Sequence, residues 1–357
     1  MMTMMEIHGQ KAASDVENYG GIDNFRLAAA FLVVAIHTGP FTCWSKPADY
    51  LFSCCLGRIA VPFFLMTTGY FVLAPCVFSG FRQKARLRRF LRKSLLLYLA
   101  ASLCYLPVSI YAGNFPSGAG EFLKNIFFDG TFYHLWYFPA VAAGSVLLLL
   151  LLRKSIKGAV IYCGAAYIVG LLGDSYYGLA EKIPALKTVY EGIFTVSSYT
   201  RNGIFYAPLF LFMGVAAAVP EFRCSKICCR AGAAISLLLM LIEGLLTYYL
   251  GIQRHNSMYL FLVPFLYFFY QILLESKQKA PGWLRNGSML VYLIHPMALI
   301  LLRGLAKAAG LAWLLVENTL IQYLTVCLLS LSGAWILQIF WEKRKIVCMK
   351  KEGHGLN

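Results

Sequence analysis

The sequence predicts an all-α fold, a polytopic transmembrane helix bundle of about ten spans. Of its 357 residues, 59% are hydrophobic and only 13% are charged, and the mean hydropathy is +0.66. A water-soluble domain of this composition would expose much apolar surface to water, whereas lipid accepts that surface. Several apolar runs, such as 135–152 and 231–250, also reach the roughly 20 residues that a span needs.

Apolar runs separated by short polar or charged loops define the expected spans. We expect them near 22–42, 54–76, 91–112, 133–152, 158–173, 203–220, 231–250, 257–275, 287–303 and 314–341. Residues 1–20 lack the apolar segment of a cleavable signal, so the first span is expected to act as a signal anchor. We therefore divide the chain into a cytoplasmic N-terminal segment (1–21), a membrane domain (22–342) and a basic cytoplasmic linker (343–357) to a soluble domain outside this sequence.

The basic residues are distributed unequally between the two sides of these spans. The net charge is +16, and 22 of the 32 Lys and Arg residues fall on the side that holds both termini. By the positive-inside rule that side is cytoplasmic, so both termini are expected inside the cell. Because these charges occupy short loops between apolar segments, they indicate topology, and nucleic acid is not an expected partner.

Cysteine usage argues against both a disulfide framework and a metal site. The eleven cysteines are scattered, mostly within spans, and their number is odd. Only Cys224, Cys228 and Cys229 form a cluster, and no histidine accompanies it in the loop. We expect free thiols and no bound metal.

The segment 79–93 is the most basic part of the chain. We expect it to begin as a loop and to continue as an amphipathic helix along the inner leaflet. Its charge suits anionic lipid, and it equally suits a phosphorylated cytoplasmic ligand such as coenzyme A. The residues assigned to this acyl-donor or lipid-binding role are Arg82, Lys84, Arg86, Arg88 and Arg89.

The first span carries the main set of ionisable residues at membrane depth. Asp23 and Arg26 are three residues apart and can pair on one helix face. His37 follows eleven residues after Arg26, which is within about 20° of three full turns and about 16 Å along the axis. That face is expected to point into the bundle, where His37 can act as a general base or bind a polar ligand. The alternative is structural, with a snorkelling ion pair and a hydrogen-bonded packing histidine.

Three further polar residues stand out within or at the ends of spans. Glu243 lies near the middle of the seventh span with no basic neighbour in sequence, so it needs a partner from another helix or a proton. His134 and His295 lie at span edges, where a packing role competes with a ligand role. In the second span, Pro62 and Gly69 permit a kink and a close backbone approach.

Several motifs show a resemblance to the acyltransferase-3 family of membrane O-acyltransferases, and the resemblance covers essentially the whole chain. They are the Arg–His pair of the first span, VPFFLMTTGYF (61–71), the basic loop after it, HLWYF (134–138), FMGV (212–215) and YLIHP (292–296). TTGY stands where SGY or SGF is common in the family. The resemblance implies a ten-span bundle that takes an acyl group from cytoplasmic acyl-CoA. It makes His37 the catalytic base, with Arg26 helping to bind the donor and Asp23 beside them.

A second group of motifs resembles the membrane half of the VanT-type membrane-bound serine racemases of D-serine-type vancomycin resistance. The motifs are AIH (35–37), YHLWYFPA (133–140), GDS (173–175), TRNGIF (200–205) and HNSMYL (255–260). In that family a cytoplasmic PLP-dependent, alanine-racemase-like half follows the membrane half. The resemblance implies that the membrane half supplies L-serine and that the PLP belongs to the other half, so no racemase site is expected here.

Two functions follow, and we favour the first. In the first, the chain binds and takes up L-serine for its own racemase domain. In the second, it is an O-acyltransferase that uses acyl-CoA. We expect it in a bacterial cell membrane, and a homodimer is one possible oligomeric state. The residues expected to bind substrate are Glu243, His134, Asp174, Arg201, Asn202, Tyr259 and His295.

Overall fold

The computed structural model describes residues 18–353, and the described part of the chain is helical without a strand. Contacts divide it into two compact units. Unit 1 contains residues 61–275, and unit 2 contains residues 18–60 together with 276–353. The all-α class predicted from the sequence is confirmed.

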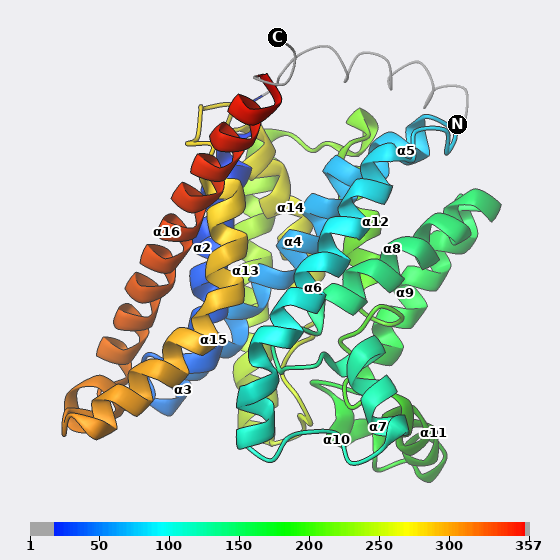
Figure 1. The fold of residues 1–357 in the computed structure, drawn as a ribbon. Helices are drawn as coiled ribbons and strands as arrows, with labels where there is room; N and C mark the ends of the chain where they lie inside the picture. The colour runs from blue at the N-terminus through cyan, green and yellow to red at the C-terminus, as the bar shows by residue number, and fades with distance from the viewer. Residues whose placement is uncertain (1–17, 354–357) are drawn as a thin grey trace. The chain divides into compact units, whose positions relative to one another are not determined.

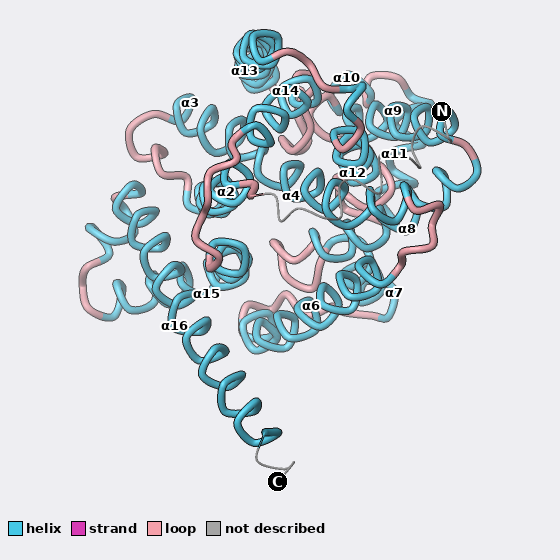
Figure 2. Tube along the Cα trace, turned by 90° about the horizontal axis from the view of Figure 1, so that it is seen from above, coloured by secondary structure: helices cyan, strands magenta, loops and turns pink. Residues whose placement is uncertain are grey.

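Unit 2 is built around three long helices, α2, α15 and α16, which lie side by side in Figures 1 and 2. Their packed core includes Ala30 and Val34 of α2, Val291 and Leu299 of α15, and Val326 of α16. The elements of this unit are α2 (Gly20–Thr38), α3 (Lys46–Asp49), η2 (Tyr50–Cys55), η3 (Leu56–Ile59), α15 (Leu284–Ala308), η7 (Trp313–Glu317) and α16 (Thr319–Gly353).

Unit 1 holds the remaining helices, with α8 and α12 in contact and α13 packed along α14. Figure 1 shows the short helices α7, α10 and α11 gathered at one end of this unit. Its elements are α4 (Ala60–Thr68, which begins at the last residue of unit 2), η4 (Gly69–Leu73), α5 (Ala74–Phe78), α6 (Ala85–Tyr111), α7 (Ala119–Lys124), η5 (Asn125–Asp129), α8 (Tyr137–Lys154), α9 (Ile156–Leu172), α10 (Tyr177–Ala180), α11 (Pro184–Val196), α12 (Ala207–Ala217), η6 (Pro220–Phe222), α13 (Lys226–Leu250) and α14 (Leu262–Glu275).

Local sequence signals set several helix ends. The hydroxyl groups of Ser155 and Ser225 accept hydrogen bonds from backbone N–H groups in the first turns of α9 and α13. Gly39 and Gly251 end α2 and α13 with φ of 58° and 60°, a left-handed conformation that glycine adopts without a Cβ clash. These caps place the polar loops that follow α2 and α13.

The second span shows the close backbone approach that Gly69 predicted. A π-helical turn begins at Gly69, and a Cβ there would collide with the backbone of Leu211 in α12. Thr67 and Thr68 donate hydrogen bonds to carbonyl oxygens one turn earlier, at 2.8 and 3.0 Å. The small residue therefore lets η4 and α12 pack backbone to backbone.

Seven of the described helices are long and apolar enough to cross a membrane. Three further apolar helices, α9, α12 and α14, have 10–17 residues. Each of the ten expected spans overlaps one of these ten segments, but the three short helices fall below the usual length of a span. The membrane class is supported, whereas the count of ten spans stays a prediction.

The basic segment 79–93 differs from the expectation in one respect. Residues 79–84 form the expected loop, but the helix that follows is not a separate surface helix. It is the first part of α6, which runs without interruption to Tyr111. Arg86, Arg88 and Arg89 are therefore exposed on the opening turns of an apolar helix, because nothing in this stretch breaks the helix before the span.

Candidate functional sites

In unit 2, Asp23 pairs with arginines from two helices. The carboxylate of Asp23 lies 3.3 Å from Nε of Arg26, as the three-residue spacing predicts. It also accepts hydrogen bonds of 2.8–3.0 Å from Nε and Nη2 of Arg285, in the first turn of α15. Asp23 is buried, so its bidentate ion pair with Arg285 fixes α2 against α15.

The other end of α2 brings two histidines together. The ring of His37 stacks on the ring of His295 in α15, with 5.3 Å between centroids and 23° between planes. His295 is fully buried, and its Nδ1 lies 2.8 Å from the carbonyl oxygen of Tyr292. Because a carbonyl oxygen only accepts, Nδ1 carries the proton and Nε2 is the basic nitrogen of the neutral ring. His37 is half-buried, so it is the more accessible member of the pair.

Glu243, in α13 of unit 1, has the cross-helix partners that its position required. Its carboxylate accepts hydrogen bonds from the hydroxyl of Tyr176 at 2.7 Å and from the backbone N–H groups of Leu260 and Phe261 at 2.6 and 2.9 Å. Burial, and then the neighbouring carboxylate, raise the pKa of Tyr176 well above its ordinary value, which keeps the phenol a donor. This arrangement holds the start of α14 against α13, and the substrate role of Glu243 stays a prediction.

Asp174 and Arg201 belong to one cluster at the loops of unit 1. The Asp174 carboxylate is buried, accepts N–H groups of Ser257 and Met258 at 2.6 and 3.1 Å, and lies 3.4 Å from Nδ1 of His255. The His255 ring in turn contacts the ring of Tyr199 at 4.8 Å between centroids.

The Arg201 guanidinium lies over two aromatic rings in the same cluster. It is 4.4 Å from the Tyr199 ring centroid and 4.9 Å from that of Trp136. Such stacking holds the guanidinium cation in one orientation. Asp174, His255, Tyr199, Arg201 and Trp136 are called the loop cluster below.

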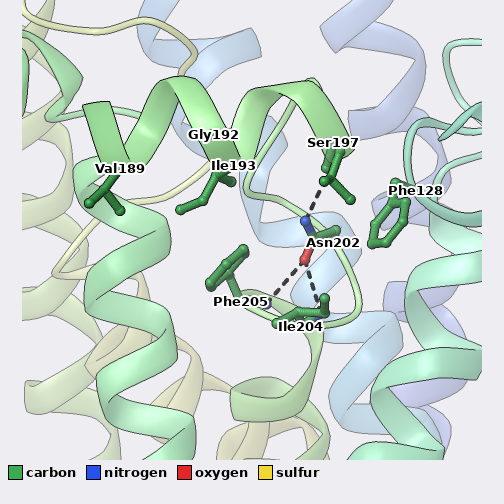
Figure 3. Close-up of a pocket in the computed structure, with 9 residues that line it drawn as sticks. Phe128, Val189, Gly192, Ile193, Ser197, Asn202, Ile204 and Phe205 are labelled. Atoms are coloured by element: carbon green, nitrogen blue, oxygen red, sulfur yellow. Dashed lines mark hydrogen bonds between the residues drawn. The ribbon is translucent and has the colours of Figure 1, made fainter. Parts of the chain in front are cut away.

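The other residues predicted to bind substrate make hydrogen bonds and ring contacts within unit 1. Asn202 accepts the N–H groups of Ile204 and Phe205 through Oδ1 and donates through Nδ2 to Ser197 and Tyr199, as Figure 3 shows in part. His134 is buried with its ring edge-on to Tyr105. Tyr259 is also buried, and its carbonyl accepts the Tyr167 hydroxyl at 2.8 Å.

The residues expected to bind the acyl donor or lipid, and the cysteines, can also be placed. Arg82, Lys84, Arg86, Arg88 and Arg89 are all exposed, on the loop before α6 and its first turns. The cysteines within the described residues are free thiols, and no group of His, Cys, Asp and Glu in that part of the chain could hold a metal.

Three contacts within these candidate sites were not predicted from the sequence. Arg285 reads as one more loop charge at the start of a span, Tyr176 as a loop aromatic, and His255 as part of a motif without a stated role. Their sequence separations from Asp23, Glu243 and Asp174 are 262, 67 and 81 residues. The only sequence signal for Arg285, Tyr176 and His255 is that each is a polar residue close to the end of an expected span.

Comparison with known proteins assigns the class. Residues 19–339 match the family described as the acyltransferase domain, so the chain belongs to the acyltransferase-3 family. It is 36% identical to a serine/alanine racemase of Enterococcus gallinarum over 320 residues, covering 87% of this chain and 45% of that protein. An amino-acid racemase of Enterococcus faecalis is also 36% identical, over 90% of this chain and 45% of its own length.

Within this class the chain resembles the membrane domain of VanT-type racemases, as the sequence motifs predicted. The chain spans about half the length of the curated relatives it matches. No solved structure matches it.

Proposed function

We propose that this chain is the membrane domain of a VanT-like serine racemase and that it binds L-serine and carries it to a cytoplasmic racemase domain. The observation that carries the proposal is the 36% identity, over 87% of the chain, to a protein named serine/alanine racemase. Since the chain covers 45% of that relative, the PLP-dependent racemisation is assigned to the other half of such a protein. A role in D-serine-type vancomycin resistance is part of the same proposal and is suggested by the VanT-type motifs of the sequence.

The loop cluster supports the binding part of this proposal. An amino acid presents a planar carboxylate, and an arginine held over two rings binds such a group with two parallel hydrogen bonds. Arg201 takes the carboxylate of L-serine in this proposal. The Asp174 carboxylate holds the His255 ring and the backbone of residues 257–258 in the same cluster.

Saturation binding of radiolabelled L-serine to the purified protein in nanodiscs tests the proposal. We expect saturable binding, weakened at least about tenfold in Arg201→Gln because a charged hydrogen-bond pair is lost. Lys187→Gln, an exposed change at the same end of unit 1, is the matched control and should bind like the parent. Absence of saturable L-serine binding in the parent would refute the proposal.

The second candidate function is acyl transfer from acyl-CoA, which the match to the acyltransferase family and the His37–His295 pair favour. Here His37 would abstract the proton of an acceptor hydroxyl, and Arg26 on the same helix would help to bind the donor. Acetyl-CoA hydrolysis or transfer by the parent, abolished in His37→Ala and retained in Arg201→Gln, would establish this function instead.

The surroundings of the protein form part of the same proposal. We place it in a bacterial cell membrane with both termini in the cytoplasm, since most basic residues lie in loops on that side. The arginines that open α6 would contact anionic lipid. The racemase domain of the same protein and a second copy of the chain are the proposed protein partners.

A further inference from the structure

Helix α11 has three distinct faces. Lys187 and Glu191 lie on a polar exposed face and form an ion pair of 3.9 Å. Tyr190 is buried in unit 1, where its hydroxyl donates to the carbonyl of Val169 in α9 at 2.7 Å. Val189 and Val196, seven residues apart and so on one face, are 56% and 54% exposed. In water this third face would leave apolar side chains exposed, whereas a helix at a membrane surface places them among acyl chains.

The exposed apolar face of α11 lines an open hollow of about 390 Å³. Phe128 of η5 and Ile204 and Phe205 of the loop before α12 complete its walls beside Val189 and Ile193, as Figure 3 shows. The amide of Asn202 also borders the hollow, but its four hydrogen bonds go to the surrounding loop. The hollow therefore offers apolar contact and no charged group.

The hollow adjoins an apolar face of a neighbouring helix. The carbonyl of Ile204, in its wall, accepts the hydroxyl of Tyr162 in α9 at 3.2 Å. Helix α9 itself exposes Ile161 and Ile168, at 71% and 46%. An exposed apolar surface of this kind marks contact with lipid or a partner, and α9 is one of the apolar segments expected to span the membrane.

We propose that this hollow binds the acyl chain of a membrane lipid and that α11 lies along the membrane interface. The two charged residues of α11, Lys187 and Glu191, pair with each other, and the residues that line the hollow are uncharged. We therefore expect the hollow to bind the acyl chain of lipids whatever the charge of their headgroup. The site is separate from the loop cluster and goes beyond the proposed handling of L-serine.

Photocrosslinking with phospholipids that carry a diazirine midway along one acyl chain tests the site. The protein is reconstituted in nanodiscs with either a phosphatidylcholine or a phosphatidylglycerol probe, and adducts are mapped by peptide mass spectrometry. We expect adducts within residues 189–205 at similar yield from both probes. A yield confined to phosphatidylglycerol, or no adduct in this range, would overturn the proposal.

A variant that fills the hollow tests whether the acyl chain binds there. A Cβ at Gly192 meets nothing within 4 Å, so Gly192→Leu puts a side chain into the space and favours the helix. We expect adducts in 189–205 to fall about tenfold, as loss of contact with about two methylenes predicts. Gly164→Leu, at an equally open position on α9, is the matched control and should keep the parent yield.

A second variant keeps the test independent of folding. Val189→Asn changes an exposed side chain that has little packing to lose, and it places an amide at the wall of the hollow. It should reduce the adducts while the thermal midpoint and the L-serine binding stay those of the parent. Parent-level adducts in both Gly192→Leu and Val189→Asn would show that the hollow does not hold the chain.

Discussion

Asp23 is a single carboxylate that two guanidinium groups share. Asp23→Asn keeps the size of the side chain but removes the negative charge that Arg26 and Arg285 both contact. We expect a loss of about 1–2 kcal/mol, less than a fully buried charged hydrogen bond contributes, because the Arg285 side chain is 59% exposed and solvent screens the pair. Thermal unfolding in detergent, followed by tryptophan fluorescence, measures it. Asp23→Glu retains the charge and should recover part of the loss, and a parent-like midpoint for Asp23→Asn would contradict this role.

The two stacked histidines should separate function from folding. His295 is fully buried and donates to a backbone carbonyl, so His295→Ala leaves a cavity and an unsatisfied oxygen, at a cost of about 2–5 kcal/mol. His37 is half-buried, so His37→Ala should lower the thermal midpoint much less, and it should abolish transfer from acetyl-CoA if His37 is a catalytic base. Thermal midpoints and acetyl-CoA turnover of the two variants, measured side by side, check the expectation.

His295→Asn is the control for this pair, because its amide can replace the Nδ1 donor to Tyr292. It should restore much of the stability lost in His295→Ala. If His37→Ala lost as much stability as His295→Ala and turned over acetyl-CoA like the parent, both histidines would be structural.

At the scale of elements, α11 is held to α9 by the hydroxyl of Tyr190. Burial raises the pKa of Tyr190 to about 12. The protonated form is favoured in the folded state, so its contribution is complete below the ordinary value near 10 and is lost as the pH rises through about 12. Tyr190→Phe lacks this group and also the hydrogen bond to Val169, which is usually worth about 1 kcal/mol.

The prediction is therefore a pH-dependent difference between parent and variant. Tyr190→Phe should melt below the parent at about pH 9, and the gap should narrow as the pH approaches about 11.5. All other titrating groups are common to both proteins, so the difference isolates Tyr190. A gap that widens with pH would mean that the folded state favours the ionised phenol.

At the scale of the whole molecule, two native thiols report the topology. Cys43 and Cys228 are both exposed, and the predicted topology places Cys43 outside the cell and Cys228 inside. A hydrogen bond from the Thr319 hydroxyl lowers the pKa of Cys43, which favours its reactive thiolate. In single-cysteine variants, a membrane-impermeant maleimide should label Cys43 in intact cells and Cys228 only after permeabilisation. The reverse pattern would invert the topology.

Much of the membrane fold follows from the sequence because the signals are local. Hydropathy over about 20 residues marks a span whatever surrounds it, and each expected span overlaps a helix in the structure. The pairing of Asp23 with Arg26 depends on a neighbour three residues away. The helices α9, α12 and α14 are too short for hydropathy alone to establish that each crosses the membrane.

The sequence by itself determined the all-α membrane class, the position of each apolar helix, the family and the polar face of α2, since these rest on composition, short motifs and helix geometry. Only the tertiary structure decided which groups meet: Arg285 with Asp23, His295 with His37, Tyr176 with Glu243, and the loop cluster around Arg201. The same holds for the hollow beside α11, whose walls come from three separate segments. Apart from Arg201 and Tyr199, which are two residues apart, these contacts join residues 56 to 262 positions apart. They depend on how helices and loops pack and not on a pattern within one helix.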